Sequence, residues 1–391
     1  MELGFVSFNQ EALNRANKVM KLMQGQGAVD ELGLGRIRDA FSNMMFPGMS
    51  VLQTHAKYFL LLPALYAYLE RIRISDPREA RTKVREYEMA LTNRLVEGSP
   101  DKTGGIIGAE TMKLGEGYVK YDPTYVYLAG LETYGLIPDG INIYATLAER
   151  SAVYQNLPKK HKGNEDGADD SDDLTGKRQI FVTCGEDYGF DSRGPLNIAL
   201  SHKEAEFLKQ KIIASTKGSL LSYLLDSGLY EIVTDYLFDD LEIVLKDIPE
   251  KYYLSYQLAL RYSRFACLLR VRYAMLYDIA VGADKKAVDE QARFEEILAE
   301  YRQEFMPEAI EEIIRFVSVK VSEESCKAFI LKASELIANG DYDELDHQIT
   351  LREKTIKGLK RSKLINAKEL QQGKPFESPT MMAYRWNTIV P

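Results

Sequence analysis

The longest apolar run of the chain covers residues 58–69 and reads YFLLLPALYAYL. These twelve residues are too few to cross a bilayer, which requires roughly twenty. The run therefore predicts a helix that is buried in a protein core. Pro63 lies inside the run and removes one helical amide, so we expect a kink or a break there.

Signals for helix starts and ends continue on both sides of this run. Ser50-Val51-Leu52-Gln53 has the spacing of a capping box and predicts a helix from Ser50 toward Ile72. The preceding Phe46-Pro47-Gly48 is typical of a tight turn, because proline fixes φ and glycine accepts a positive φ. Asp122-Pro123 predicts the start of another helix, and Gly135 predicts its end.

The second half of the chain is also rich in helix signals. Ser201-His202-Lys203-Glu204 is a second capping box. We expect one helix to begin at Pro249 and end at Gly282, and another to begin at Ser322 and end at Asn339-Gly340. Residues 342–361 predict a last helix that is basic toward its end. The expected fold class is therefore mainly α, a multi-helical protein.

Two short stretches predict a minor β element. Residues 104–120 are glycine-rich with short apolar pieces, so we expect a small hairpin that leads into a helix, which would give the N-terminal half a winged-helix-like part. Ile180-Phe181-Val182 is the most strand-like triplet of the chain.

An acidic stretch suggests where the chain divides. At 391 residues the chain exceeds the size of a single ordinary core, so we expect two domains. Residues 159–176 are acidic with almost nothing apolar, which favours a linker. They lack the glycine and glutamate positions of an EF-hand calcium loop. We therefore expect an N-terminal helical domain at 1–158, an acidic linker at 159–176 and a C-terminal helical domain at 177–391.

Composition limits the classes of function. The chain has 50 basic and 58 acidic residues and a net charge of −8, so any contact with nucleic acid requires a local basic patch. Its three cysteines form no CxxC pair, which favours a reducing compartment. The start of the chain lacks a signal-peptide pattern. We expect a cytoplasmic protein that does not interact with membranes.

No catalytic motif is recognisable. The four histidines are scattered, no HExxH or GxSxG motif occurs, and the glycine-rich stretches match neither a Walker A loop nor a dinucleotide fingerprint. We therefore identify no catalytic residues, expect no metal and no cofactor, and favour a non-enzymatic protein. Catalysis by residues that meet only in the fold stays open.

Two basic stretches are candidates for contact with an anionic partner. The first contains Arg261, Arg264 and Arg272 on one helical face. For it we favour internal pairing with the acidic residues of 226–242, because buried arginines are usually paired. The second stretch, 352–374, has eight basic residues and two acidic ones.

We select Lys357, Lys360, Arg361 and Lys363 from the second stretch as a nucleic-acid contact, because such a cluster can follow a phosphate backbone. A solvated helix end whose cations suit the helix dipole is an equal alternative. Trp386 is the only tryptophan, and we expect it to dock the C-terminal tail onto the body of the protein.

Several motifs resemble those of an uncharacterised bacterial family. They are DELGLGRIRDAF at 30–41, FPG at 46–48, QTHAKYFL at 53–60, GIIG at 105–108, YLAGL at 127–131, EAEFL at 204–208 and YRW at 384–386. The family has arginine at the positions of His55 and Lys57, so one of these two positions loses its positive charge here at neutral pH. We add Arg36, Arg38, His55 and Lys57 from these motifs to the candidate nucleic-acid contacts.

The resemblance implies a biological setting but no chemical activity. Relatives are encoded near helicase and phospholipase D-type nuclease genes in phage-defence islands. We therefore expect a non-enzymatic subunit of a bacterial antiviral-defence or DNA-processing system, with helicase or nuclease subunits as protein partners and nucleic acid as a further candidate ligand. The alternatives are a nuclease or other hydrolase whose carboxylates meet only in the fold, and a structural protein that oligomerises through its helices.

Overall fold

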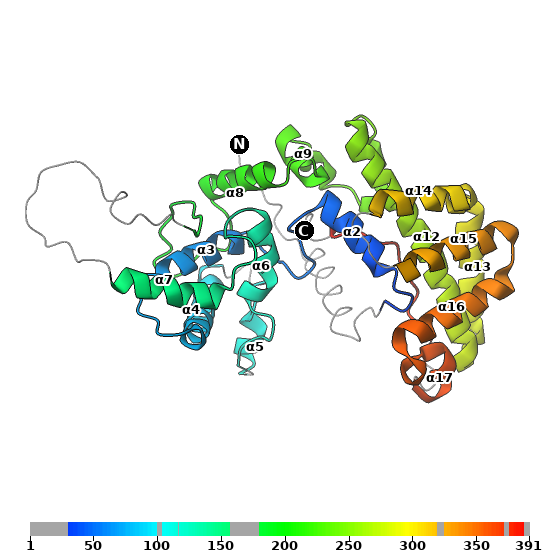
Figure 1. Ribbon diagram of the computed structural model, residues 1–391, viewed down its shortest axis with the longest axis horizontal. Helices are drawn as coiled ribbons and strands as arrows, with labels where there is room; N and C mark the ends of the chain where they lie inside the picture. Colours follow the sequence, from blue (N-terminus) through cyan, green and yellow to red (C-terminus); the bar gives the residue numbers. More distant parts are fainter. Residues whose placement is uncertain are drawn as a thin grey trace, which may run out of the picture. The chain divides into compact units, whose positions relative to one another are not determined.

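The computed structural model describes residues 30–99, 104–115, 117–156, 180–318, 324–370 and 375–386. Their contacts form two compact units. Among the described residues, unit 1 contains 47–229, and unit 2 contains 30–46 together with 230–386. The regular elements in this part of the chain are all helices, so the mainly α fold class is confirmed (Figure 1).

Unit 1 is built around one apolar helix. Its helices are α3 (Tyr58–Leu69), α4 (Pro77–Gly98), α5 (Ala109–Lys113), α6 (Pro123–Thr133), α7 (Ile143–Gln155), α8 (His202–Ser215) and α9 (Leu220–Ser227). α3 is the predicted core helix, and it contacts α4, α6, α7 and α8. The Phe59 ring lies 4.9 Å from the Tyr127 ring and 5.0 Å from the Tyr134 ring, between their centroids.

The predicted helix start at Ser50 is wrong. The Ser50 N–H donates to the Gln53 side chain at 3.0 Å and the Leu52 N–H donates to the Ser50 hydroxyl, but these bonds close a turn, and α3 begins only at Tyr58. The helix continues through Pro63 without a break. The turn at Gly48 is confirmed by its φ of 79°, and the Tyr134 ring leaves no room for a Cβ atom on this glycine.

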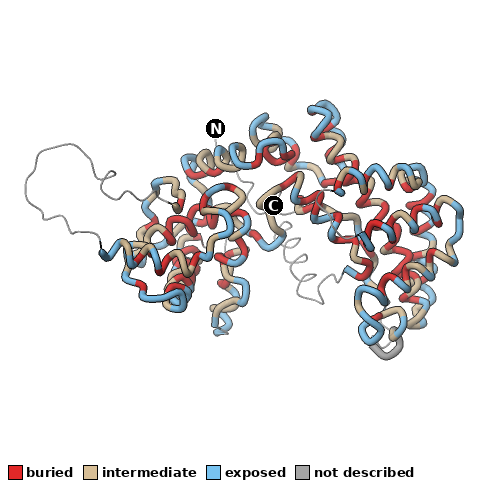
Figure 2. Tube along the Cα trace, viewed as in Figure 1, coloured by how far each residue is buried: buried red, intermediate tan, exposed pale blue. Residues whose placement is uncertain are grey.

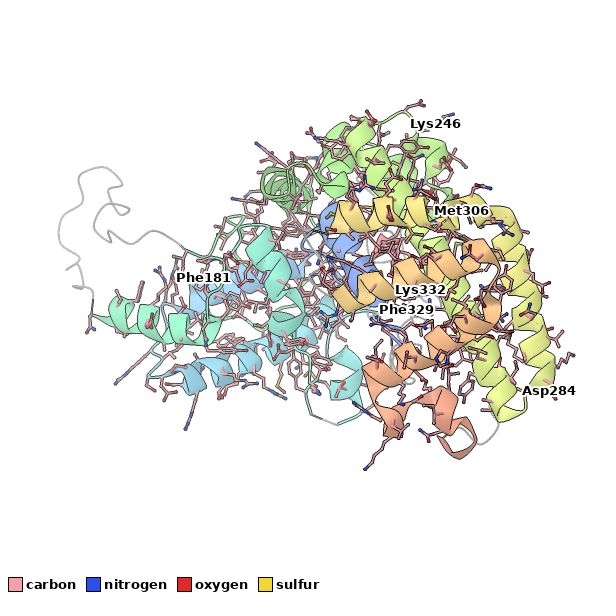
Figure 3. The ribbon with its side chains drawn as sticks, turned by 45° about the vertical axis from the view of Figure 1, so that its right-hand side comes forward. Phe181, Lys246, Asp284, Met306, Phe329 and Lys332 are labelled. Carbon is pink, nitrogen blue, oxygen red and sulfur yellow. The ribbon has the colours of Figure 1, made fainter. Side chains whose placement is uncertain are left out.

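The β element and the winged-helix-like part are not found in the described residues. The described residues 104–115 and 117–120 form loops and the short α5. Phe181 (Figure 3) is buried in the core of unit 1, where its ring centroid lies 5.4 Å from that of Tyr66. The Val182 N–H donates to the Leu136 carbonyl, but the chain beside it forms no ladder, so the triplet stays irregular.

Unit 2 contains the remaining helices and the tail. They are α2 (Gly35–Met45), α10 (Tyr230–Val233), η2 (Phe238–Asp240), α11 (Glu242–Leu245), α12 (Glu250–Val281), α13 (Asp284–Tyr301), η3 (Arg302–Phe305), α14 (Pro307–Val317), α15 (Glu324–Asn339), α16 (Tyr342–Lys357), η4 (Leu359–Arg361) and α17 (Lys363–Leu370). The long helix α12 lies at the centre of this core, because most of its residues are buried (Figure 2). As predicted, it follows Pro249 and ends at Gly282 with a φ of 76°.

The tail 375–386 lies along α12 in the opposite direction. The Phe376 N–H donates to Asp278 at 2.6 Å, near the end of α12, and the Met382 N–H donates to Ser263 at 2.7 Å. The Trp386 indole is buried and donates to the Tyr236 carbonyl at 2.9 Å. The predicted docking of the tail through its tryptophan is therefore confirmed.

The predicted linker at 159–176 lies outside the described residues. On its C-terminal side, Phe181, Tyr188, Ile198 and Leu208 are buried in the same core as α3. The contacts therefore place residues 180–229 in unit 1, and the division between the two units follows Leu229. Ser322, which was predicted to begin a helix, also lies outside the described residues.

Candidate nucleic-acid interface

In the basic stretch that begins at Arg352, some cationic side chains face solvent and others contact carboxylates inside unit 2. α16 ends at Lys357 rather than at the predicted Arg361, and the chain turns through η4 into α17. Lys354, Lys360 and Arg361 are exposed around this change of direction. We call these three residues the basic turn. Lys357 and Lys363 contact carboxylates of unit 2 instead.

Glu353 holds the turn together from inside. Its buried carboxylate accepts the Tyr273 hydroxyl at 2.8 Å and the Ser362 hydroxyl at 2.6 Å. It also accepts the backbone N–H groups of Lys363 at 2.8 Å and Leu364 at 3.1 Å. A buried carboxylate with this many donors fixes the chain around it. From the sequence, Glu353 was considered only as a negative charge within a basic stretch, and its structural role was missed. Its place among so many basic residues was the one sign of that role.

Glu31 pairs with the two inward lysines. Its carboxylate contacts the Lys357 ammonium and lies 2.9 Å from the Lys363 ammonium. Burial and the nearby positive charges of Lys363 and Arg361 lower the pKa of Lys357 to about 8, against the opposing effect of Asp30. Burial also lowers the pKa of Lys363. The Lys357 ammonium is therefore poorly solvated and lies near other cations as well as the carboxylate of Glu31.

The other two candidates of unit 2 lie on α2, and the chain just before α2 passes close to α16. Gly33 precedes α2 with a φ of 68°, and a Cβ atom there would lie 2.8 Å from the Arg352 guanidinium and 2.9 Å from Ile356. Arg36 is exposed on the first turn of α2. Arg38 is also exposed and donates to its neighbour Asp39 at 2.8 and 2.9 Å.

The structure gives His55 and Lys57 of unit 1 internal partners. The His55 ring lies 2.8 Å from the Gly104 carbonyl oxygen. Lys57 is buried, and its ammonium donates to both oxygens of Glu204 at 2.6 and 2.7 Å. This pairing leaves the Lys57 ammonium almost no exposed surface for a phosphate. Its partner lies 147 positions away in sequence, so no local pattern indicates the pair.

The arginines of α12 form internal ion pairs, as we favoured from sequence. Their partners are Glu312 for Arg261 at 2.7 Å, Glu304 for Arg264 at 2.6 Å and Asp346 for Arg272 at 2.6 Å. The expected partners at 226–242 were wrong, because η3, α14 and α16 place later carboxylates beside this face. These pairs link α12 to η3, α14 and α16 within unit 2.

The described residues contain no group of three or more histidine, cysteine, aspartate or glutamate side chains that could hold a metal ion. Such a group is the observation that would favour the nuclease alternative. Among the described helices, none is both long and apolar enough to cross a membrane.

Comparison with known protein families gives a match to the first part of the chain. Residues 1–153 match the model of a family described as "Family of unknown function (DUF6361)". The matched residues include most of the motifs that carry the resemblance noted above, and they support an uncharacterised domain in this part of the chain. No curated protein and no solved structure matches the chain.

Proposed function

We propose that this chain is a non-enzymatic, cytoplasmic subunit of a bacterial antiviral-defence or DNA-processing system. In this role it binds partner proteins, such as helicase or nuclease subunits, and contacts nucleic acid through the basic turn. The motif resemblance suggests the biological setting. The arrangement of charge at the end of α16 supports the contact with nucleic acid.

The observation that carries the proposal is the separation of charge at this turn. Two carboxylates next to this turn, Glu31 and Glu353, are buried and engaged with lysines, hydroxyls and backbone N–H groups. The cations of the basic turn face solvent instead. A surface whose negative charges are buried and whose positive charges are exposed attracts a phosphate backbone.

The helix dipole accounts for only part of this arrangement. A cation in the last turn of a helix gains about 0.3–1 kcal/mol from the dipole, which suits Lys354. Lys360 and Arg361 lie beyond the end of α16, in η4. Their exposure therefore supports a surface role, and Arg36 on α2 is a further candidate contact.

The test replaces the three cations of the basic turn with glutamine. Lys357 and Lys363 stay unchanged, because their loss would leave the buried Glu31 carboxylate without its partners. Binding of the parent and the variant to labelled duplex and single-stranded oligonucleotides is measured at low salt. We expect the parent to bind and the variant to bind at least tenfold more weakly, at about 1 kcal/mol per lost contact.

The matched control removes the same charge elsewhere in unit 2. Lys246, Lys285 and Lys332 are exposed and belong to different elements, two of them labelled in Figure 3. Their replacement with glutamine should leave affinity within about twofold of the parent, because scattered charges act weakly at a distance. If both triple variants bind equally well, or if the parent binds neither probe, the basic turn is not a nucleic-acid contact.

A further inference from the structure

We propose that unit 1 carries a separate site for single-stranded nucleic acid, at which Tyr121 and Tyr125 stack on bases and Arg81, Arg85 and Lys120 contact phosphates. This site shares no residue with the basic turn, so each can fail without the other. None of these residues belongs to the candidate contacts identified from sequence.

The two tyrosines form an exposed stacked pair at the start of α6. Their ring centroids are 4.9 Å apart, and their planes differ by 28°. Tyr121 is 46% exposed and Tyr125 is 61% exposed. Asp122 lies between them in sequence and caps α6 by accepting the Tyr125 N–H at 2.8 Å, which fixes the backbone beneath the pair. Single exposed aromatics are common, but in a stacked pair each ring holds the other in place and can offer its outer face to a base.

Cations accompany the tyrosines of this region. The Lys120 ammonium lies 5.2 Å from the centroid of the Tyr121 ring. Two arginines one turn apart on α4 also lie over tyrosine rings, Arg85 over Tyr118 at 5.4 Å and Arg81 over Tyr144 at 5.9 Å. All three cations are exposed. A cation over a ring lies within reach of a phosphate when a base stacks beside it.

Two carboxylates of this region have internal hydrogen-bond partners. Glu88 is buried on α4, and burial together with Asp122 raises its pKa to about 8, so it is largely neutral at pH 7. Asp122 is engaged as the cap of α6. Burial with the nearby Asp122 and Glu88 raises the pKa of Tyr144 to about 12, whereas Arg81 lowers it, which indicates that these groups lie close together.

This combination fits a single strand better than a duplex. The faces of duplex bases are covered by their neighbours, whereas a single strand can offer them to aromatic rings. Each stacked base contributes about 1–3 kcal/mol, with little preference for sequence. A peptide with acidic side chains would use the cations but would not require the rings.

The test separates stacking from charge. A labelled oligothymidylate of about 20 nucleotides, longer than the footprint of a typical single-strand domain, is titrated with the parent, Tyr121→Ala and Tyr125→Ala. We expect each alanine variant to bind about tenfold more weakly, with an unchanged dependence of affinity on salt. Tyr125→Phe should retain binding because its ring remains. The control, Tyr154→Ala, removes a 46% exposed tyrosine of α7 and should bind like the parent.

Thermal unfolding of each variant is measured alongside, and an unchanged midpoint assigns the loss to binding. The inference is overturned if the alanine variants bind like the parent, or if polyglutamate competes as well as unlabelled oligothymidylate. Binding to duplex but not to oligothymidylate would also overturn it and would leave the basic turn standing. Conversely, the tyrosine variants could lose binding while the basic-turn variant does not. That result would support the tyrosine site and contradict the basic turn as a nucleic-acid contact.

Discussion

Lys57 and Glu204 form a buried ion pair that joins the start of α3 to the first turn of α8. The Lys57 ammonium donates to both carboxylate oxygens, and the Tyr188 hydroxyl donates to one of them at 2.7 Å. Glu204 also accepts the Ser201 N–H at 2.7 Å, as one arm of the capping box. Two of the family-like motifs, 53–60 and 204–208, therefore meet in one polar cluster.

We predict that Lys57→Met destabilises the protein by about 3–5 kcal/mol, because it leaves a buried carboxylate without its cation. Glu204→Gln should cost a similar amount. The double variant should lose less than the sum of the two, and denaturant unfolding of all four proteins measures this coupling. Additive losses would show that the pair contributes no interaction of its own.

The same pair predicts sensitivity to acid. Burial raises the pKa of Glu204, but hydrogen bonds from Lys57, Ser201 and Tyr188 outweigh it, and the net pKa is lowered. A carboxyl whose folded pKa is depressed stabilises the protein above its unfolded pKa, and this contribution is lost as the pH falls through the folded value. Stability should therefore fall below about pH 4.5 in the parent. The fall should be smaller in Glu204→Gln.

The capping box of α8 gives a smaller, local prediction. The Glu204 N–H donates to the Ser201 hydroxyl at 3.3 Å, so the box expected from sequence is confirmed. Ser201→Ala should reduce the free energy of unfolding by about 1 kcal/mol and leave any nucleic-acid binding intact. A binding defect at unchanged stability would assign this serine to a functional surface instead.

Glu88 predicts a pH dependence of opposite sign. One of its oxygens accepts the Thr124 N–H and hydroxyl at 2.8 and 2.7 Å, whereas the other, Oε2, is buried with no hydrogen-bond partner. With a folded pKa of about 8 and an unfolded pKa of about 4.3, the folded state holds an extra proton between these values. The contribution of Glu88 to the free energy of unfolding should therefore fall as the pH rises through that window.

Glu88→Gln tests this sign, because an amide resembles the protonated carboxyl in shape but does not titrate. The variant should gain stability relative to the parent from pH 5 to pH 8, by up to a few kcal/mol. Chemical unfolding at several pH values measures the difference. A difference that is constant with pH would mean that Glu88 does not titrate in this range.

The sequence predicted those parts of the fold that depend on neighbouring residues. The cap at Ser201, the ends of α12 and the helical class follow from such patterns. The box at Ser50 misled, because its hydrogen bonds close a turn whether or not a helix follows. The partners of Lys57 and of the α12 arginines could not be predicted, because they come from distant helices. For the same reason, the basic stretch gave no sign of which lysines face inward.

Composition and packing together predict the result of limited proteolysis. The acidic, apolar-poor sequence of 159–176 predicts cleavage there. Because 180–229 packs in unit 1, the two fragments should remain associated. They should separate on a denaturing gel and elute together in size-exclusion chromatography. Separate elution of the fragments would favour independent domains on either side of this segment. Cleavage that occurs first elsewhere would contradict the assignment of 159–176 as a linker.

The salt dependence of binding tests the central claim most directly. The logarithm of the association constant for a duplex probe is plotted against the logarithm of salt concentration, for the parent and for the variant with Lys354, Lys360 and Arg361 replaced by glutamine. Each lost phosphate contact should reduce the slope by about 0.9, so we predict a slope shallower by about 2 to 3. An unchanged slope, or a parent that does not bind at low salt, would contradict the account of this surface as a nucleic-acid interface.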